Sequence, residues 1–122
     1  MPTTSRELLL AAYTSFNARD IDAVLKTMHE NVEWPNGMEG GRVHGHAEVR
    51  DYWTRQWKLV DPRVEPVGFE TEADGRIAVT VHQRVCDLSG KVLVDHLIGH
   101  VYRIEDGLIQ SMEIRELTQE LT

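Results

Sequence analysis

The chain has 122 residues, with 13 Lys and Arg against 20 Asp and Glu, and a formal net charge of -7 at pH 7. A chain of this length can bury one modest core, so we expect a single domain over residues 1–122. The excess of negative charge repels phosphate backbones and anionic lipids, which argues against nucleic acid or a membrane surface as a partner.

The N-terminus and the single cysteine narrow the class further. No apolar run approaches the ~20 residues of a membrane helix, and the first ten residues lack the basic start and apolar stretch of a secretory signal. We therefore expect a cytoplasmic protein. Cys86 is the only cysteine, so an intrachain disulfide and a zinc site built on sulfur are excluded.

Capping signals mark the first two helices. Thr4 and Glu7 have the spacing of a capping box, and the apolar residues that follow recur at helical spacing, which predicts a helix over residues 5–18. Asp20 is placed to accept a hydrogen bond from the first turn of a second amphipathic helix. We expect this second helix to end near His29.

A third helix is expected after a less regular stretch. Residues 32–34 form a short strand-like segment that Pro35 stops, and the glycine-rich stretch over residues 36–45 is typical of a loop. Residues 46–59 then have helical periodicity. Its apolar face is formed by Val49, Trp53 and Trp57.

The pattern changes from helical to alternating beyond Pro62, which predicts strands. Four are expected, over residues 64–72, 76–87, 91–105 and 108–117. The connectors between them are short and contain residues that tolerate positive φ, so successive strands should form antiparallel hairpins. Helices first and strands afterward predict an α+β domain in which three N-terminal helices pack on one face of a curved, mainly antiparallel sheet.

Four segments, in order, resemble the SnoaL-like, nuclear-transport-factor-2-like family. They are FNARDID at residues 16–22, VEW at residues 32–34, HGHAEVRDYW at residues 44–53 and VYRIEDGLI at residues 101–109. The resemblance implies a cone-shaped α+β barrel around a small-molecule pocket, and a homodimer formed through the open sheet face. The family contains polyketide cyclases, ketosteroid isomerases, dehydratases, limonene-type epoxide hydrolases and non-catalytic binding proteins, so the chemistry has to be argued from the pocket.

Known catalytic positions of the family are only partly matched. The carboxylate base of ketosteroid isomerases corresponds to Trp34, and the protonated acid of their oxyanion hole corresponds to His100. Their helix-one tyrosine corresponds to Ala12, with Tyr13 one place out of register. The aspartate that some relatives carry after Met112 is absent. Isomerisation of the steroid type is therefore disfavoured.

Three residues are candidates for catalysis: His100, His82 and Arg84. Alternation places His96 and His100 on one face of a strand about 13 Å apart, too far to share a metal ion, and we expect neither metal nor cofactor. His82 and Arg84 share one face of the preceding strand. If that face lines the pocket, Arg84 stabilises an enolate while His82 or His100 moves a proton. The alternative, which we favour, places that face on the outer surface of the sheet.

Several apolar side chains come from elements that line the cavity in similar proteins, and such a lining suits a flat, largely apolar molecule. Tryptophans at helical spacing also fit plain core packing. The candidate ligand-binding residues are Phe16, Trp34, Trp53, Trp57, Met112 and Ile114.

Two functions follow. The first is a small-molecule protein that acts on a hydrophobic carbonyl compound by cofactor-independent proton transfer, as an isomerase, cyclase or dehydratase. The second is a non-catalytic ligand-binding or dimerisation module of the same fold. A pocket-facing His100 with a polar partner and a shifted pKa favours the enzyme. A third possibility, a protein-partner adaptor, requires an exposed apolar patch.

Overall fold

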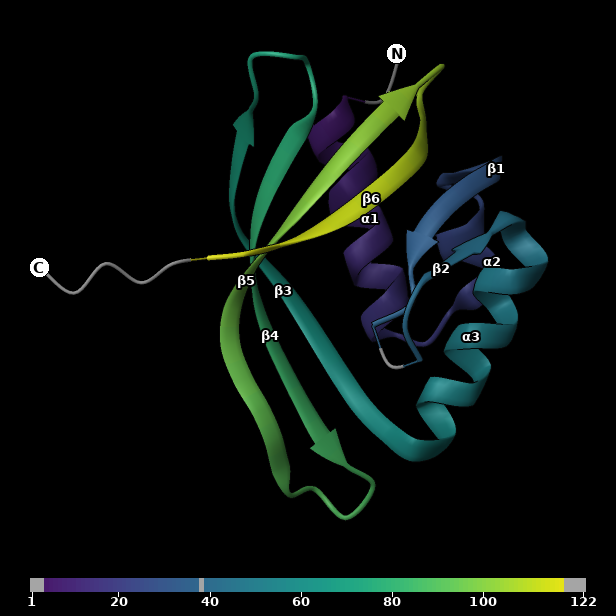
Figure 1. Cartoon of the computed structure of the whole chain (residues 1–122), viewed down its shortest axis with the longest axis vertical. Coiled ribbons are helices and arrows are strands. Elements are labelled where there is room, and N and C mark those ends of the chain that lie inside the picture. Colours follow the sequence, from purple (N-terminus) through teal and green to yellow (C-terminus); the bar gives the residue numbers. More distant parts are fainter. Residues whose placement is uncertain (1–3, 38, 118–122) are drawn as a thin grey trace, which may run out of the picture.

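A computed structural model describes residues 4–37 and 39–117 of the chain. Over these residues, three helices and six strands form an α+β domain (Figure 1). In chain order they are α1 (Ser5–Asn17), α2 (Ile21–Leu25), β1 (Met28–Pro35), β2 (Arg42–His44), α3 (Gly45–Leu59), β3 (Val60–Thr71), β4 (Ile77–Asp87), β5 (Val92–Glu105) and β6 (Leu108–Glu116).

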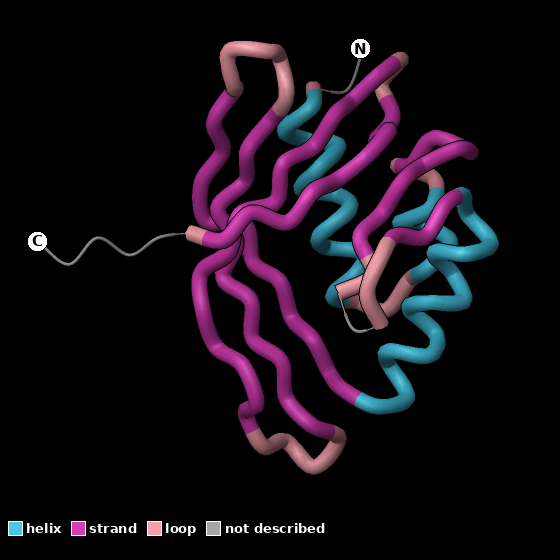
Figure 2. The backbone as a smooth tube through the Cα atoms, viewed as in Figure 1, coloured by secondary structure: helices cyan, strands magenta, loops and turns pink. Residues whose placement is uncertain are grey.

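The strands form one sheet in the order β2-β1-β6-β5-β4-β3. Neighbouring strands are antiparallel except β1 and β6, which are parallel. The sheet curves strongly and the helices lie on one side of it (Figure 2). Its edges, β2 and β3, do not pair with each other, so the cone is an open curved sheet and not a closed barrel.

The predicted helix caps are confirmed. The Thr4 hydroxyl accepts a hydrogen bond from the Glu7 N–H at 3.1 Å, and the Asp20 carboxylate accepts one from the Ala23 N–H at 3.1 Å. Each bond satisfies a backbone donor that the first helical turn leaves without a partner. The caps therefore set the starts of α1 and α2 as the sequence indicated.

The end of α2 was predicted too late. The helix ends at Leu25, and His29 lies in β1 instead of at a helix end. The Thr27 hydroxyl donates to the Val24 carbonyl at 2.6 Å, while the Thr27 carbonyl accepts from the Ile109 N–H at 2.8 Å. The chain after Leu25 thus pairs with β6 instead of continuing the helix. Local periodicity does not reveal this pairing.

Three strands extend into stretches predicted otherwise. Arg42–His44, placed in a loop, forms β2 against the end of β1. A three-residue strand is too short to show alternation. β3 begins at Val60 and contains Pro62, because it is an edge strand in which a residue without an N–H can be tolerated. β1 begins at Met28, four residues before the predicted segment 32–34, whereas β4, β5 and β6 agree with the predicted ranges to within one residue at each end.

Hairpins connect β3 to β4, β4 to β5 and β5 to β6, as predicted. In the last of them Asp106 and Gly107 have φ of 53° and 75°. Two successive positive φ values match the right-handed twist of a two-residue hairpin, which Asp-Gly adopts readily. The turn therefore fixes the register of β5 on β6, and with it the faces on which their side chains lie.

The core lies between the helices and the inner face of the sheet. Its side chains come from all three helices and all six strands of the described residues. Asn17, at the end of α1, donates to the Val64 carbonyl at 2.8 Å and accepts from the Val64 N–H at 3.0 Å, which fastens α1 to β3. In the described part of the chain, no helix is both long and apolar enough to span a membrane.

Candidate ligand pocket

A pocket of about 390 Å³ opens between α1, α3, β1 and the inner face of the sheet. Within residues 4–37 and 39–117, no Asp, Glu, Lys or Arg lines it. The pocket therefore presents apolar surface and uncharged polar groups to a ligand. Its lining is Ala12, Tyr13, Phe16, Val24, Trp34, Pro35, Gly37, Tyr52, Trp53, Gln56, Val60, Pro62, Val64, Gln83, Val85, Val94, His96, Ile98, His100, Tyr102, Met112 and Ile114.

Aromatic rings make the helix side of the wall. Trp53 packs edge-on against Phe16, with ring centroids 5.2 Å apart, and against Trp34 at 5.7 Å. Trp57 is not in the lining, because it stacks behind Trp53 at 6.0 Å while the Arg19 guanidinium covers its ring at 5.0 Å. Five of the six predicted ligand-binding residues thus line the pocket: Phe16, Trp34, Trp53, Met112 and Ile114.

A chain of three buried polar side chains closes the inner end of the pocket. The Tyr102 hydroxyl donates to the Tyr13 hydroxyl at 2.7 Å, and the Tyr13 hydroxyl lies 2.8 Å from His100 Nδ1. With the Tyr13 oxygen accepting from Tyr102, we assign the Tyr13 proton to Nδ1, and the neutral imidazole then carries its hydrogen on Nε2. His100 therefore presents an N–H donor, and its orientation is set by α1 and β5 together.

Burial keeps this chain uncharged. Desolvation lowers the pKa of His100 from 6.5 to about 4, so the imidazole is neutral at pH 7. The same cause raises the pKa of Tyr13 and of Tyr102 above the ordinary tyrosine value. A neutral His100 is a hydrogen-bond donor to a ligand oxygen and not a base at neutral pH. Neutral imidazoles polarise carbonyls in this way in other enzymes.

A second polar pair lies toward the exposed end of the pocket, which we call the mouth. Gln83 on β4 faces His96 on β5, and His96 Nε2 lies 2.9 Å from Gln83 Oε1. Val94 and His96 are both exposed there. The pocket thus has a buried end at His100 and a mouth at His96, both on the same face of β5.

His82 and Arg84 lie on the opposite face of β4 from the pocket. They face Leu97 and Asp95 across the β4–β5 ladder, and His82 Nε2 is 2.6 Å from the Asp95 carboxylate. The pocket-facing alternative for these two residues is therefore corrected: strand alternation sends Gln83 inward and its neighbours outward. Neither residue lines the pocket.

The loop between β1 and β2 is held against α3 beside the pocket. Arg55 binds both oxygens of Glu39, at 3.0 and 2.9 Å, and Asn36 donates to Glu39 at 2.9 Å. These bonds lower the pKa of Glu39 to about 2. Gly37, in the same loop, lines the pocket. The ion pair therefore positions one wall through contacts outside the cavity.

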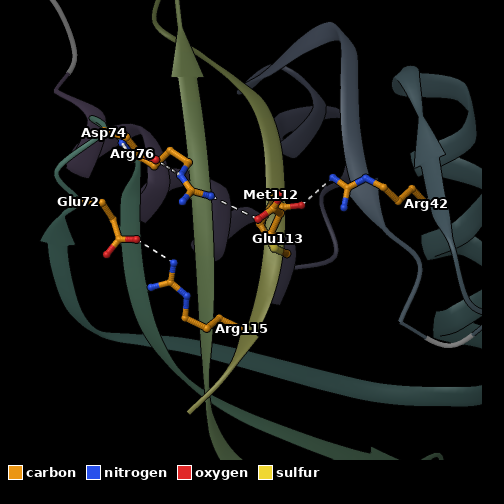
Figure 3. Close-up of polar contacts among 7 residues, drawn as sticks. All are labelled: Arg42, Glu72, Asp74, Arg76, Met112, Glu113 and Arg115. Carbon is orange, nitrogen blue, oxygen red and sulfur yellow. Dashed lines mark hydrogen bonds and ion pairs between the residues drawn. The ribbon is translucent and has the colours of Figure 1, made fainter. Parts of the chain in front are cut away.

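Arginine side chains also hold β6 in place, as Figure 3 shows. Arg42 donates to the Met112 carbonyl at 2.9 Å, where β1 and β6 are no longer in regular register. On the other side Arg76 reaches Glu113 at 3.3 Å, and Arg115 reaches Glu72 at 2.8 Å. Because side chains alternate along β6, this anchoring holds Met112 and Ile114 toward the pocket.

Sequence patterns did not point to five polar residues of the pocket: Tyr13, Tyr52, Gln56, Gln83 and Tyr102. Tyr13 was set aside as one place out of register with the family tyrosine, although it shares a helix face with Leu9 and Phe16. Tyr102 lies two residues after His100, on the same strand face, and Gln83 lies between the inward-facing positions of β4. Alternation from His100 and along β4 was the signal that could have found the last two.

Comparisons with known proteins identify a matching family and similar folds. The model of the SnoaL-like domain family matches residues 9–112. The structure of TerC co-crystallised with polyporic acid is 30% identical, covering 91% of this chain and 89% of that chain, with a TM-score of 0.79. A nuclear-transport-factor-2-like protein of unknown function from Burkholderia pseudomallei is 28% identical, covering 91% and 88%, with a TM-score of 0.78.

A putative polyketide cyclase from Pseudomonas putida is 25% identical, covering 96% of this chain and 92% of that chain, with a TM-score of 0.73. A comparison with curated protein sequences gives no match. Among the residues that the structure describes, no cluster of three or more His, Cys, Asp or Glu side chains could hold a metal ion.

Proposed function

Because the chain belongs to the SnoaL-like domain family, we propose that it binds a flat, hydrophobic carbonyl compound in this pocket and moves a proton on it without a cofactor. One observation carries the proposal. The buried Tyr102–Tyr13–His100 chain ends in an Nε2–H donor at the inner end of a largely apolar cavity. Such a donor matches a carbonyl oxygen.

The chemistry follows from the charge that develops on that oxygen. When a carbonyl compound loses the proton on its α carbon, negative charge moves to the oxygen as an enolate. A donor already oriented in a water-poor site stabilises this charge more than it stabilises the neutral carbonyl. Tyr13 and Tyr102 hold the His100 ring in place, so little reorganisation is needed during the reaction.

Among the described residues, no carboxylate lines the pocket, and this favours a second candidate function, which is ligand binding without catalysis. A proton acceptor has to be a water molecule admitted through the mouth, because His96 lies about 13 Å from His100 along β5, too far from the α carbon of a carbonyl bound there. If water does not serve, the same pocket describes a ligand-binding module without catalysis. The two candidates share the binding step and differ only in proton transfer.

The relatives suggest where to begin a ligand search. The structure of TerC, 30% identical, was obtained with polyporic acid, and the Pseudomonas putida relative is described as a putative polyketide cyclase. Polyporic acid and polyketide-like aromatic ketones are therefore the first compounds to test. The pocket supports this choice with aromatic walls on α1, α3 and β1.

Binding of a matched ligand pair tests the carbonyl contact. We expect 4-acetylbiphenyl to bind more tightly than 4-ethylbiphenyl, which has nearly the same shape but no acceptor. His100→Phe should remove that preference, about three- to tenfold in Kd, because it deletes the N–H donor. Titration calorimetry measures the Kd of both ligands for the wild-type protein and for His100→Phe. His82→Phe, on the outer face, is the control, and an unchanged preference in His100→Phe contradicts the proposal.

Deuterium exchange separates the enzyme from the binding module. In D₂O, the wild-type protein should accelerate exchange of the acetyl protons of 4-acetylbiphenyl, and His100→Phe should slow that exchange while still binding the ligand. Proton NMR follows the loss of the methyl signal. Binding with exchange no faster than in buffer assigns the second candidate.

A homodimer through the outer face of the sheet is part of the proposal. Leu97 is 44% exposed on that face, beside the His82–Asp95 pair. Two-fold dimers are the commonest oligomers, and a second copy would cover this leucine. Sedimentation velocity should give a dimer for the wild type and a monomer for Leu97→Glu. A monomeric wild type at all concentrations contradicts this part.

A further inference from the structure

We propose that Gln83 and His96 form a second polar subsite whose hydrogen-bond polarity is opposite to that of His100. The ligand would then carry an acceptor at the buried end and a donor, such as a phenolic hydroxyl, at the mouth. This inference rests on the proposed function, because it places the carbonyl on His100 and adds a requirement for the other end of the molecule.

The two subsites lie on one line along the sheet. His96 and His100 are four residues apart on the same face of β5, a separation of about 13 Å. Ile98 lies between them on β5, with Val81 opposite it on β4. A ligand that reaches both ends is therefore elongated and has an apolar middle. The aromatic rings of the opposite wall suit a flat molecule of that shape.

Gln83 sets the polarity of the second subsite. Its Oε1 lies 2.9 Å from His96 Nε2, and an amide oxygen only accepts, so Nε2 carries the hydrogen. A neutral imidazole has one N–H, which leaves His96 Nδ1 as an acceptor. At the buried end the arrangement is reversed, because His100 Nδ1 accepts from Tyr13 and Nε2 donates.

Hydrogen-bond polarity is the main means of discrimination that this pocket has. No charged side chain lines it within the described ranges 4–37 and 39–117, so an ion pair cannot orient the ligand. A molecule inserted the wrong way round would place its carbonyl against the His96 lone pair, so that two acceptors face each other. Its hydroxyl oxygen could still accept from the His100 N–H, but the hydroxyl hydrogen would lose its water at the buried end without gaining a partner.

Three ketones test this inference: 4-acetyl-4′-hydroxybiphenyl, 4-acetyl-4′-methoxybiphenyl and 4-acetylbiphenyl. They share the carbonyl end, and only the first has a donor at the far end. We expect the hydroxyl compound to bind the wild-type protein about three- to tenfold more tightly than either of the others. In His96→Leu this advantage should vanish, with the affinity for 4-acetylbiphenyl retained.

The control is His82→Leu, which removes a histidine from the opposite face of the sheet and should keep the hydroxyl preference. Gln83→Leu should weaken that preference, because it frees the His96 ring from its fixed tautomer. If the three ketones bind the wild type equally and still depend on His100, the second subsite is wrong and the proposed function stands. If His96→Leu keeps the hydroxyl preference, the subsite is also wrong. If none of the three binds, both proposals fall.

Discussion

The folded chain is expected to lose about 3 kcal/mol of its free energy of unfolding through His100 when the pH falls from 6.5 to 4. Burial lowers the pKa of this group from 6.5 to about 4, so the unfolded chain takes up a proton that the folded chain refuses in this range. Each unit of difference between the pKa in the folded chain and the pKa in the unfolded chain corresponds to about 1.4 kcal/mol. The stability is present above pH 6.5 and is lost as the pH falls toward 4.

Urea denaturation at several pH values measures this effect, with His100→Asn as the matched variant. Asparagine keeps an acceptor for the Tyr13 hydroxyl and does not titrate, so the variant should show a flatter dependence than the wild type between pH 6.5 and 4. His82→Asn, whose side chain is 39% exposed, should keep the wild-type slope. Equal slopes for the wild type and His100→Asn would show that burial does not hold His100 neutral.

Trp53→Ala should destabilise the fold by about 3–5 kcal/mol. The Trp53 side chain is 2% exposed and packs against Phe16, Trp34 and Trp57. Removing the indole enlarges the pocket into the core and leaves three aromatic rings without a shared neighbour. A loss of this size is a large part of the stability of an ordinary domain.

Thermal and urea unfolding of Trp53→Ala and Trp53→Phe measure this cost. Phenylalanine keeps an aromatic contact and should cost less than alanine. A loss below 1 kcal/mol for Trp53→Ala would mean that the cluster repacks around the gap. Because this residue supports the core as well as the pocket, weaker ligand binding in Trp53→Ala would not by itself identify a ligand contact, and His100→Phe is the sharper variant.

Local patterns were sufficient for most of the fold. The caps at Thr4 and Asp20, the 3.6-residue spacing in α1 and α3, and the Asp106-Gly107 turn all act through neighbouring residues, so they are visible in the sequence. The end of α2 was missed because pairing with the distant strand β6 decides it, and β2 was missed because three residues are too few to show alternation.

The candidate site shows the same division. Alternation along β5 correctly placed His96 and His100 on one face, and the family resemblance drew attention to His100. Alternation along β4 could not show which of its two faces points inward. Either face is compatible with the pattern until the helices cover one of them. The structure places Gln83 inward, with His82 and Arg84 outward.

By itself, the sequence determined the fold class, the order of the helices and strands, and the aromatic character of the pocket, because these depend on periodicity, capping and composition. Only the tertiary structure decided the hydrogen-bonding state of His100. Tyr13 and His100 are 87 residues apart and meet only when α1 lies on β5. The burial that lowers the His100 pKa likewise comes from the whole packed core, and no local pattern encodes it.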